Sequence, residues 1–229
     1  MDSERTAPLG RPRGFDVDEA LERAVLVFWA QGYEGASLDA LTGAMGITRT
    51  SMYRAFGNKE DLFHKALERY TDGPASYVAR ALGQATAREV ATTFLGGAVR
   101  STTRPDCPSG CLGVQGALAA GESGRPARDR LTAWREGGTA HLRDRFQRAV
   151  DDGDLPAGAD PARLARYLMT VANGIAVQAA GGTARNDLQM VADMALHAWP
   201  PGDPSGAPGG APGPACVETG DHDRTPHGD

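Results

Sequence analysis

The chain has 229 residues, with 24 basic against 29 acidic side chains and a formal net charge of −5. Hydrophobic residues make up 41% of it, enough to bury the core of one large or two small domains. Its apolar runs are too short to span a bilayer, no signal segment opens it, and three cysteines cannot form a disulfide framework. We therefore expect a cytoplasmic protein with no membrane partner.

The two ends of the chain differ from its middle. Residues 1–14 contain three arginines, and the stretch from Arg5 to Phe15 has no acidic residue, so we predict a basic flexible arm suited to a DNA minor groove, the alternative being a solvated, frayed terminus. Residues 200–229 hold seven Pro, seven Gly and five acidic residues against one Arg, which predicts a disordered acidic tail. This tail carries most of the net charge, so the acidic total does not exclude a nucleic-acid partner.

Between these ends, hydrophobic residues recur every three to four positions, which predicts an all-α fold. In residues 15–70, four helix starts carry a capping residue: Asp16, Ser37, Thr48 and Asn58. We expect glycines, Gly32 and Gly46, to end the first two of these helices. Two short helices that meet at the Gly46 turn predict a helix-turn-helix, whose second helix enters a major groove of DNA.

The outward face of that second helix supplies candidate DNA contacts. With Met52 and Phe56 facing inward, arginine, threonine and tyrosine side chains face outward. An arginine near the helix start can bind a guanine edge with two hydrogen bonds, and a threonine can contact a base, whereas the remaining polar groups suit phosphates. The expected DNA-binding residues are Arg49 and Thr50 for bases, Ser37, Thr48, Ser51, Tyr53, Arg54 and Lys59 for the backbone, and Arg11 and Arg13 for the minor groove.

Residues 15–70 also resemble a known family. The resemblance rests on Ala30-Gln-Gly-Tyr33, Ser37-Leu-Asp-Ala-Leu41, Ala44-Met-Gly-Ile-Thr48, Ser51-Met-Tyr-Arg-Ala-Phe56 and Asn58-Lys-Glu-Asp-Leu62, in this order. This stretch is similar to the N-terminal helix-turn-helix three-helix domain of TetR-family transcriptional regulators. The resemblance implies that residues 71–199 form a C-terminal helical ligand-binding and dimerisation domain, in which the last two helices build a four-helix interface between two copies.

Helix signals continue through residues 71–199. Gly73-Pro74 should end or kink the fourth helix, and further helices are predicted over about 86–101 and 110–121, after Pro126, after Asp160, and up to Trp199. Three large side chains, Trp134, Phe146 and Met169, could line an effector pocket, although at helical spacing they could equally belong to the core.

The cysteines and histidines allow a second interpretation. Cys111 at a helix start would have a lowered thiol pKa, and Cys107 could resolve it, which would make a redox switch; packing or pocket lining is the alternative for both. Cys216 lies in the tail. The five histidines do not cluster, so no metal site is expected, and no catalytic triad, phosphate loop or dinucleotide fingerprint occurs.

The sequence thus predicts a homodimeric DNA-binding regulator, most simply a repressor, that is not an enzyme and needs no cofactor. Its partners would be a palindromic double-stranded DNA operator and a small effector, apolar or amphipathic, that releases the operator. Two alternatives remain: a thiol redox-sensing regulator that uses Cys107 and Cys111, and a helical scaffold that does not bind DNA.

Overall fold

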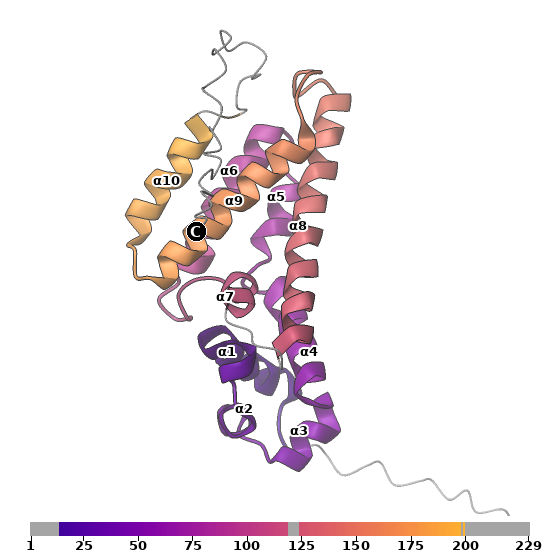
Figure 1. Cartoon of the computed structure of the whole chain (residues 1–229), viewed down its shortest axis with the longest axis vertical. Helices are drawn as coiled ribbons and strands as arrows, with labels where there is room; N and C mark the ends of the chain where they lie inside the picture. The colour runs from indigo at the N-terminus through magenta and orange to yellow at the C-terminus, as the bar shows by residue number, and fades with distance from the viewer. Residues whose placement is uncertain (1–13, 119–123, 198, 200–229) are drawn as a thin grey trace, which may run out of the picture.

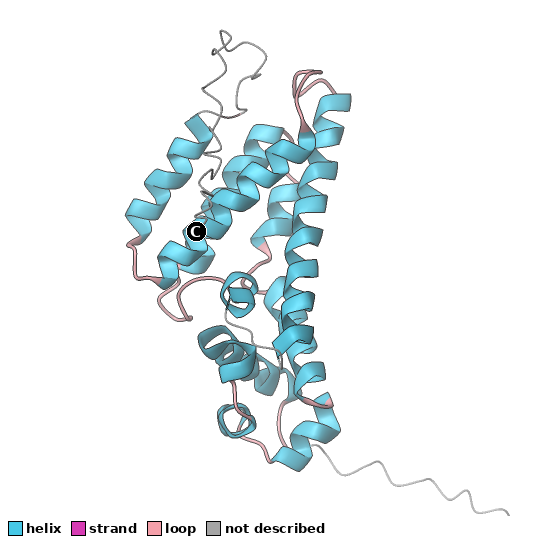
Figure 2. Ribbon diagram, in the orientation of Figure 1, coloured by secondary structure: helices cyan, strands magenta, loops and turns pink. Residues whose placement is uncertain are grey.

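The structure is a computed structural model that describes residues 14–118, 124–197 and 199. Helices make up most of this part of the chain, and no strand occurs within it (Figure 2). The helices are α1 (Val17–Gly35), α2 (Leu38–Met45), α3 (Arg49–Phe56), α4 (Lys59–Asp72), α5 (Tyr77–Leu82), α6 (Ala87–Thr102), α7 (Leu112–Leu118), α8 (Arg125–Asp151), α9 (Pro161–Ala180) and α10 (Arg185–His197). The all-α prediction is confirmed. The predicted arm and tail lie outside the described residues, apart from Gly14.

The four predicted capping residues begin α1 to α4. Asp16 accepts hydrogen bonds from the amides of Asp18 and Glu19, and Ser37 and Thr48 each accept one from the third residue of their helix. Asn58 forms a capping box with Asp61. Because each side chain satisfies a free amide of the first turn, the chain fixes where these helices begin.

Glycine shapes two of the connections. Gly46 ends α2 in the left-handed region (φ +68°), which only glycine adopts at little cost, and the turn then leads into α3. Gly32 has a non-helical conformation (φ +69°, ψ 177°), so the first regular stretch of α1 ends there, as predicted. A second short helical stretch follows this kink and carries α1 on to Gly35.

The lower part of the molecule is a cluster of α1 to α4 (Figure 1). Its buried side chains include Phe28, Leu41, Met52, Phe56 and Phe63, and the rings of Phe28 and Phe63 meet edge to face at 5.1 Å between centroids. The predicted inward residues of α3 are therefore in the core. Rotation of α3 about its own axis would expose these two side chains to water. Burial of Met52 and Phe56 therefore fixes which face of α3 points outward.

The upper part is built around α6, which packs against α5, α9 and α10, while α8 runs along α9 (Figure 1). Its core includes Phe94, Leu95, Leu142, Phe146 and Leu168, all at most 1% exposed. α5 was missed by the sequence analysis: it has only six residues, no side-chain cap and glycines close to both ends. α6 has the predicted capping box, Thr86 with Glu89.

A junction connects the two parts, with two buried hydrogen bonds and a third that is exposed. The indole Nε1 of Trp29 in α1 donates to the carbonyl of Gly110 (3.2 Å), and the hydroxyl of Tyr70 in α4 donates to Sγ of Cys111 (3.3 Å). Trp134 of α8 donates from Nε1 to Oγ1 of Thr71, the next residue of α4 (2.9 Å). α4 is thus fastened to both α7 and α8 by its last turn.

This packing makes Gly113 a sensitive position. A Cβ atom there would overlap the Trp134 ring, lying 2.7 Å from its Cε3, and the ring is held by its hydrogen bond to Thr71. We expect Gly113→Ala to lower the free energy of unfolding by about 1–3 kcal/mol. The matched control is Gly137→Ala in α8, where a Cβ meets nothing within 4 Å, and it should stabilise by about 0.5–1 kcal/mol. Urea unfolding of both variants measures this, and equal effects would contradict the assigned contact.

Candidate nucleic-acid interface and ligand cavity

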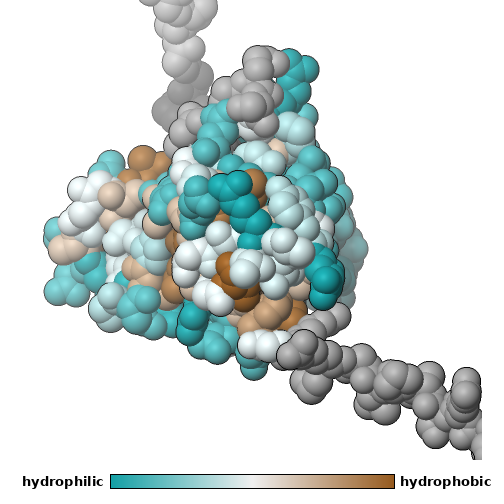
Figure 3. All heavy atoms as spheres, turned by 90° about the horizontal axis from the view of Figure 1, so that it is seen from below, coloured by the Kyte–Doolittle hydropathy of each residue, from teal (hydrophilic) through white to brown (hydrophobic). Residues whose placement is uncertain are grey.

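The outward face of α3 lies at the lower end of the molecule. Arg49, Thr50 and Arg54 are exposed, Tyr53 is 49% exposed, and Ser51 is partly buried. Viewed from this end, hydrophilic and hydrophobic residues are interspersed on the surface (Figure 3). The structure therefore places the five predicted α3 residues on or near one accessible face, as a helix that enters a groove requires.

Arg49 is already oriented by a neighbour in α2. Its Nη2 and Nε lie 2.7 Å and 3.2 Å from Oδ1 of Asp39. The two side chains are 56% and 79% exposed, so this ion pair adds little to stability. Its effect is to hold the guanidinium at the junction of α2 and α3. The sequence analysis missed Asp39, although its place in the first turn of α2 puts it beside the start of α3.

Three residues that were predicted to contact the DNA backbone, Ser37, Thr48 and Ser51, take part in helix capping. Oγ of Ser37 accepts from the amide of Ala40 (3.0 Å). Oγ1 of Thr48 accepts from the amide of Ser51 (3.1 Å) and donates to the Ser51 hydroxyl at the same distance. A capping oxygen at an exposed helix start leaves other first-turn amides free to meet a phosphate, so the structural role and the predicted role are compatible.

Lys59 has a partner that the sequence did not suggest. Its ammonium lies 4.6 Å from the centre of the Tyr33 ring, a cation–π contact between the first turn of α4 and the end of α1. Burial lowers the pKa of Lys59, and the nearby carboxylate of Glu34 partly opposes this shift. The ring fixes a cation at a helix N-terminus, where the helix dipole alone would disfavour it. Arg11 and Arg13 lie outside the described residues.

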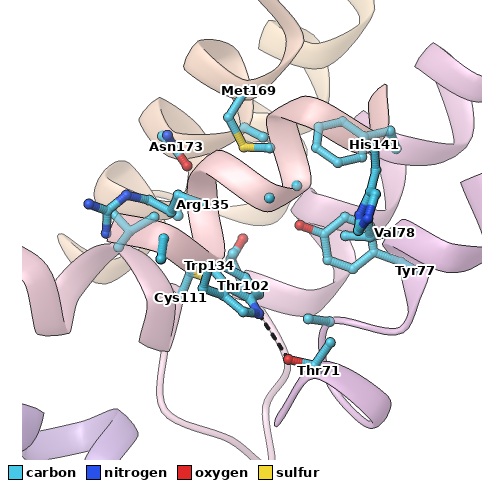
Figure 4. A pocket seen from close by; sticks show the side chains of 18 of the residues that line it. Thr71, Tyr77, Val78, Thr102, Cys111, Trp134, Arg135, His141, Met169 and Asn173 are labelled. Carbon is cyan, nitrogen blue, oxygen red and sulfur yellow. Dashed lines mark hydrogen bonds between the residues drawn. The ribbon is translucent and has the colours of Figure 1, made fainter. Parts of the chain in front are cut away.

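A cavity of about 330 Å³ lies between α4, α5, α6, α7, α8 and α9 (Figure 4). Apolar groups form most of its wall, and the described residues that line it include no carboxylate. Trp134 and Met169, two of the three pocket candidates, line it, whereas Phe146 is a buried core residue. Its polar lining comes from Thr71, Tyr77, Thr102, Cys111, Arg130, Trp134, Arg135, His141 and Asn173.

The polar groups of this cavity fall into two kinds. Arg135 donates to the Gly113 carbonyl (2.6 Å) and to Thr132, so it also holds α7 against α8. His141 and Asn173, in contrast, make no side-chain hydrogen bond to any described residue. Groups of the second kind are available to a ligand. The sequence analysis did not select them because they lie on α8 and α9, far apart along the chain.

The prediction for Cys111 was wrong in its direction. Burial raises the pKa of this thiol, and the hydrogen bonds from Tyr70 and from the amides of Gly113 and Val114 offset the shift only in part. Burial also raises the pKa of Cys107, which is partly buried and lines a different surface depression. Both thiols are therefore mainly protonated near neutral pH, which disfavours the redox alternative. Cys216 lies outside the described residues.

No group of three or more metal-binding side chains occurs within the described ranges. In the same part of the chain, no helix is long and apolar enough to cross a membrane.

Comparisons with known proteins agree with this geometry. Residues 20–66 match the model of bacterial regulatory proteins of the tetR family, and residues 88–185 match the tetracyclin repressor-like C-terminal domain. The HTH-type transcriptional repressor ComR of Escherichia coli (strain K12) is 29% identical over 193 residues, which are 83% of this chain and 92% of ComR. YezE of Bacillus subtilis (strain 168), an uncharacterized HTH-type transcriptional regulator, is 32% identical over 166 residues, 70% of this chain and 84% of YezE.

Among solved structures, a cysteine mutant of the TetR-family transcriptional regulator CifR, complexed with 26-bp double-strand operator DNA, is 44% identical with a TM-score of 0.79. The match covers 83% of this chain and 100% of that chain. A TetR regulator from Rhodococcus sp. RHA1 is 43% identical over 80% of this chain and 97% of its own, with a TM-score of 0.55. The chain belongs to the TetR family. It is a DNA-binding transcriptional regulator and not an enzyme.

Proposed function

We propose that the protein is a repressor that binds a palindromic operator as a homodimer and is released by a small effector. The observation that carries this proposal is the exposed face of α3 with Arg49 held at its start, on a chain 44% identical to a regulator solved on operator DNA. The name of ComR, a transcriptional repressor, supports repression rather than activation. Binding to chromosomal DNA would place its action in the cytoplasm.

We assign residues 15–70 to DNA binding and residues 71–199 to effector binding and dimerisation, with residues 1–14 as the arm and 200–229 as the tail. In this arrangement Arg49 and Thr50 contact bases. Ser37, Thr48, Ser51, Tyr53, Arg54 and Lys59 contact phosphates, and Arg11 and Arg13 enter the minor groove.

The direct test of this assignment selects bound fragments from a random DNA pool at stated salt, which should enrich a palindrome. Arg49→Ala should then lose about 1–3 kcal/mol of discrimination at one base pair of each half-site. The control is Arg143→Ala, which removes an exposed arginine that pairs with the adjacent Asp144 on α8. Absence of an enriched palindrome, or unchanged specificity in Arg49→Ala, would contradict the proposal.

The dimer interface is assigned to α9 and α10. Their outer surfaces carry large apolar side chains that are unusually exposed: Val177 (47%), Met190 (58%), Val191 (47%) and Met194 (74%). α9 and α10 are neighbours in the fold, so these side chains can form one apolar patch (Figure 1). Such a patch on a single chain is typical of an interface with a second copy.

A charge within this patch should separate the two copies. Met194→Glu places a carboxylate where the partner would be, so we expect a shift from dimer to monomer in sedimentation equilibrium at micromolar concentration. Ala162→Glu adds the same charge to an exposed position in the first turn of α9 and should stay dimeric. A Met194→Glu variant as dimeric as the parent would place the interface elsewhere.

The effector site is assigned to the 330 Å³ cavity, because its wall reaches the DNA-binding part through α4. Thr71 lines the cavity at the end of α4, and Lys59 stands at the start of the same helix. A ligand that displaces Trp134 would disturb its hydrogen bond to Thr71. A resulting shift of α4 would then move the outward face of α3, which we call the reading face. A difference of about 1–3 kcal/mol in affinity between the two states suffices for induction.

Filling the cavity tests this assignment. Gly137 lines it, and a Cβ atom there would meet nothing within 4 Å, so Gly137→Leu should fill part of the cavity. Small apolar and amphipathic compounds are screened for release of the protein from its operator. For any active compound, we expect the concentration that gives half-maximal release to rise at least about tenfold in Gly137→Leu, while the affinity for the operator stays unchanged. Gly137→Ala is the matched control. Equal responses of both variants would rule this cavity out.

A further inference from the structure

A second depression, of about 440 Å³, gathers four arginines on the surface of the upper part. Arg80 comes from α5, Arg100 from α6, Arg104 from the loop after α6, and Arg185 from the first turn of α10. We call it the arginine groove. Its remaining described lining residues are Gly73, Pro74, Ser76, Tyr77, Gly97 and Ser101, and no carboxylate is among them. α5, α6 and α10 lie in the upper half of Figure 1, away from α3.

Most of this positive charge is not neutralised within the described residues. Arg104 pairs with Asp106 at 2.9 Å. Arg80 donates only to the hydroxyl of Ser76 (2.8 Å), and Arg185 donates only to the hydroxyl and carbonyl of Thr103 (2.7 and 2.8 Å). Arg100 makes no hydrogen bond or ion pair with the part of the chain described. Three of the four arginines thus have no acidic partner in this part of the chain, so an anion is the ligand that the depression suits by charge.

The groove is also partly preorganised. Two hydrogen bonds to Thr103 fix the guanidinium of Arg185, and the Ser76 hydroxyl steadies that of Arg80. The Ser101 hydroxyl donates to the Pro74 carbonyl at 2.7 Å, and Gly97 lets the Tyr77 ring pack directly on α6, because a Cβ at this position would overlap that ring. A guanidinium presents a planar fork of donors that matches phosphate oxygens, so four guanidinium groups around one depression favour a ligand with several such oxygens.

We propose that the arginine groove binds a small phosphorylated compound with at least two negative charges, at a site separate from the effector cavity. Tyr77 lines both the groove and the cavity, and the groove includes the turn that joins α4 to α5. A bound anion would bridge α5, α6 and α10 beside that turn. The site therefore gives the protein a second small-molecule input that adjoins the first.

Calorimetric titration of the full chain with pyrophosphate, in the absence of DNA and at constant ionic strength, tests this. We expect saturable binding that weakens at least fivefold in Arg100→Gln and again in Arg100→Gln with Arg185→Gln. Arg100→Gln removes a side chain without a protein partner, so the fold should be unaffected. Arg166→Gln, an exposed position of α9 outside the groove, and Arg49→Ala, at the reading face, should bind as the parent does.

Four results would overturn the proposal. One is binding no stronger than that of chloride at equal ionic strength. A second is an unchanged affinity for pyrophosphate in Arg100→Gln. A third is loss of binding in Arg49→Ala, since the anion would then occupy the outward face of α3. The fourth is tighter binding of citrate than of pyrophosphate, which would contradict the phosphate assignment.

Discussion

The arrangement of the two parts depends on the packing of Trp29, Tyr70 and Trp134, whose outer edge is closed by the hydrogen bond from Trp134 to Thr71. This hydrogen bond joins the wall of the cavity to the last turn of α4, and the three rings pack with centroids 4.9 Å and 6.2 Å apart in successive pairs. Buried aromatic pairs of this kind permit few alternative packings. α4 also carries Lys59 at its other end, so one helix joins this junction to the DNA-binding part of the fold.

Two of the cations assigned to DNA contact are each held by one neighbouring side chain. Arg49 is held by Asp39 and Lys59 by the ring of Tyr33. Both partners leave the cation accessible, and neither ties up its full hydrogen-bonding capacity. Binding then requires less ordering of flexible side chains, which is one of the main costs of association. The acidic total of the chain does not oppose this arrangement, since much of that charge belongs to residues 200–229.

The local features of the fold could be predicted from sequence, and the long-range ones could not. Asp16, Ser37, Thr48 and Asn58 cap helices through residues two or three positions away, so spacing alone reveals them. α5 lacks such a signal, whereas the break in α1 at Gly32 was visible as a glycine that follows an apolar stripe. The Asp39–Arg49 pair, the Lys59–Tyr33 contact and the polar lining of the cavity depend on how helices meet, which no periodicity encodes. Val191 on α10 follows the apolar spacing of its helix and is nevertheless exposed, because spacing alone does not show which apolar side chains the fold buries.

Two opposing effects act on the pKa of the Cys111 thiol, which lies where α4 meets α7. Its position before α7, with hydrogen bonds from backbone amides, favours the thiolate, and this was the basis for predicting a lowered pKa. Burial opposes it and is the larger effect, because an ionised sulfur would lose nearly all contact with water. The sulfur instead accepts the hydrogen bond of the Tyr70 hydroxyl and satisfies a buried donor of α4. A thiol in this position connects α4 to the start of α7 through the Tyr70 hydroxyl, so the contribution of Cys111 that the structure shows is to packing and not to redox chemistry.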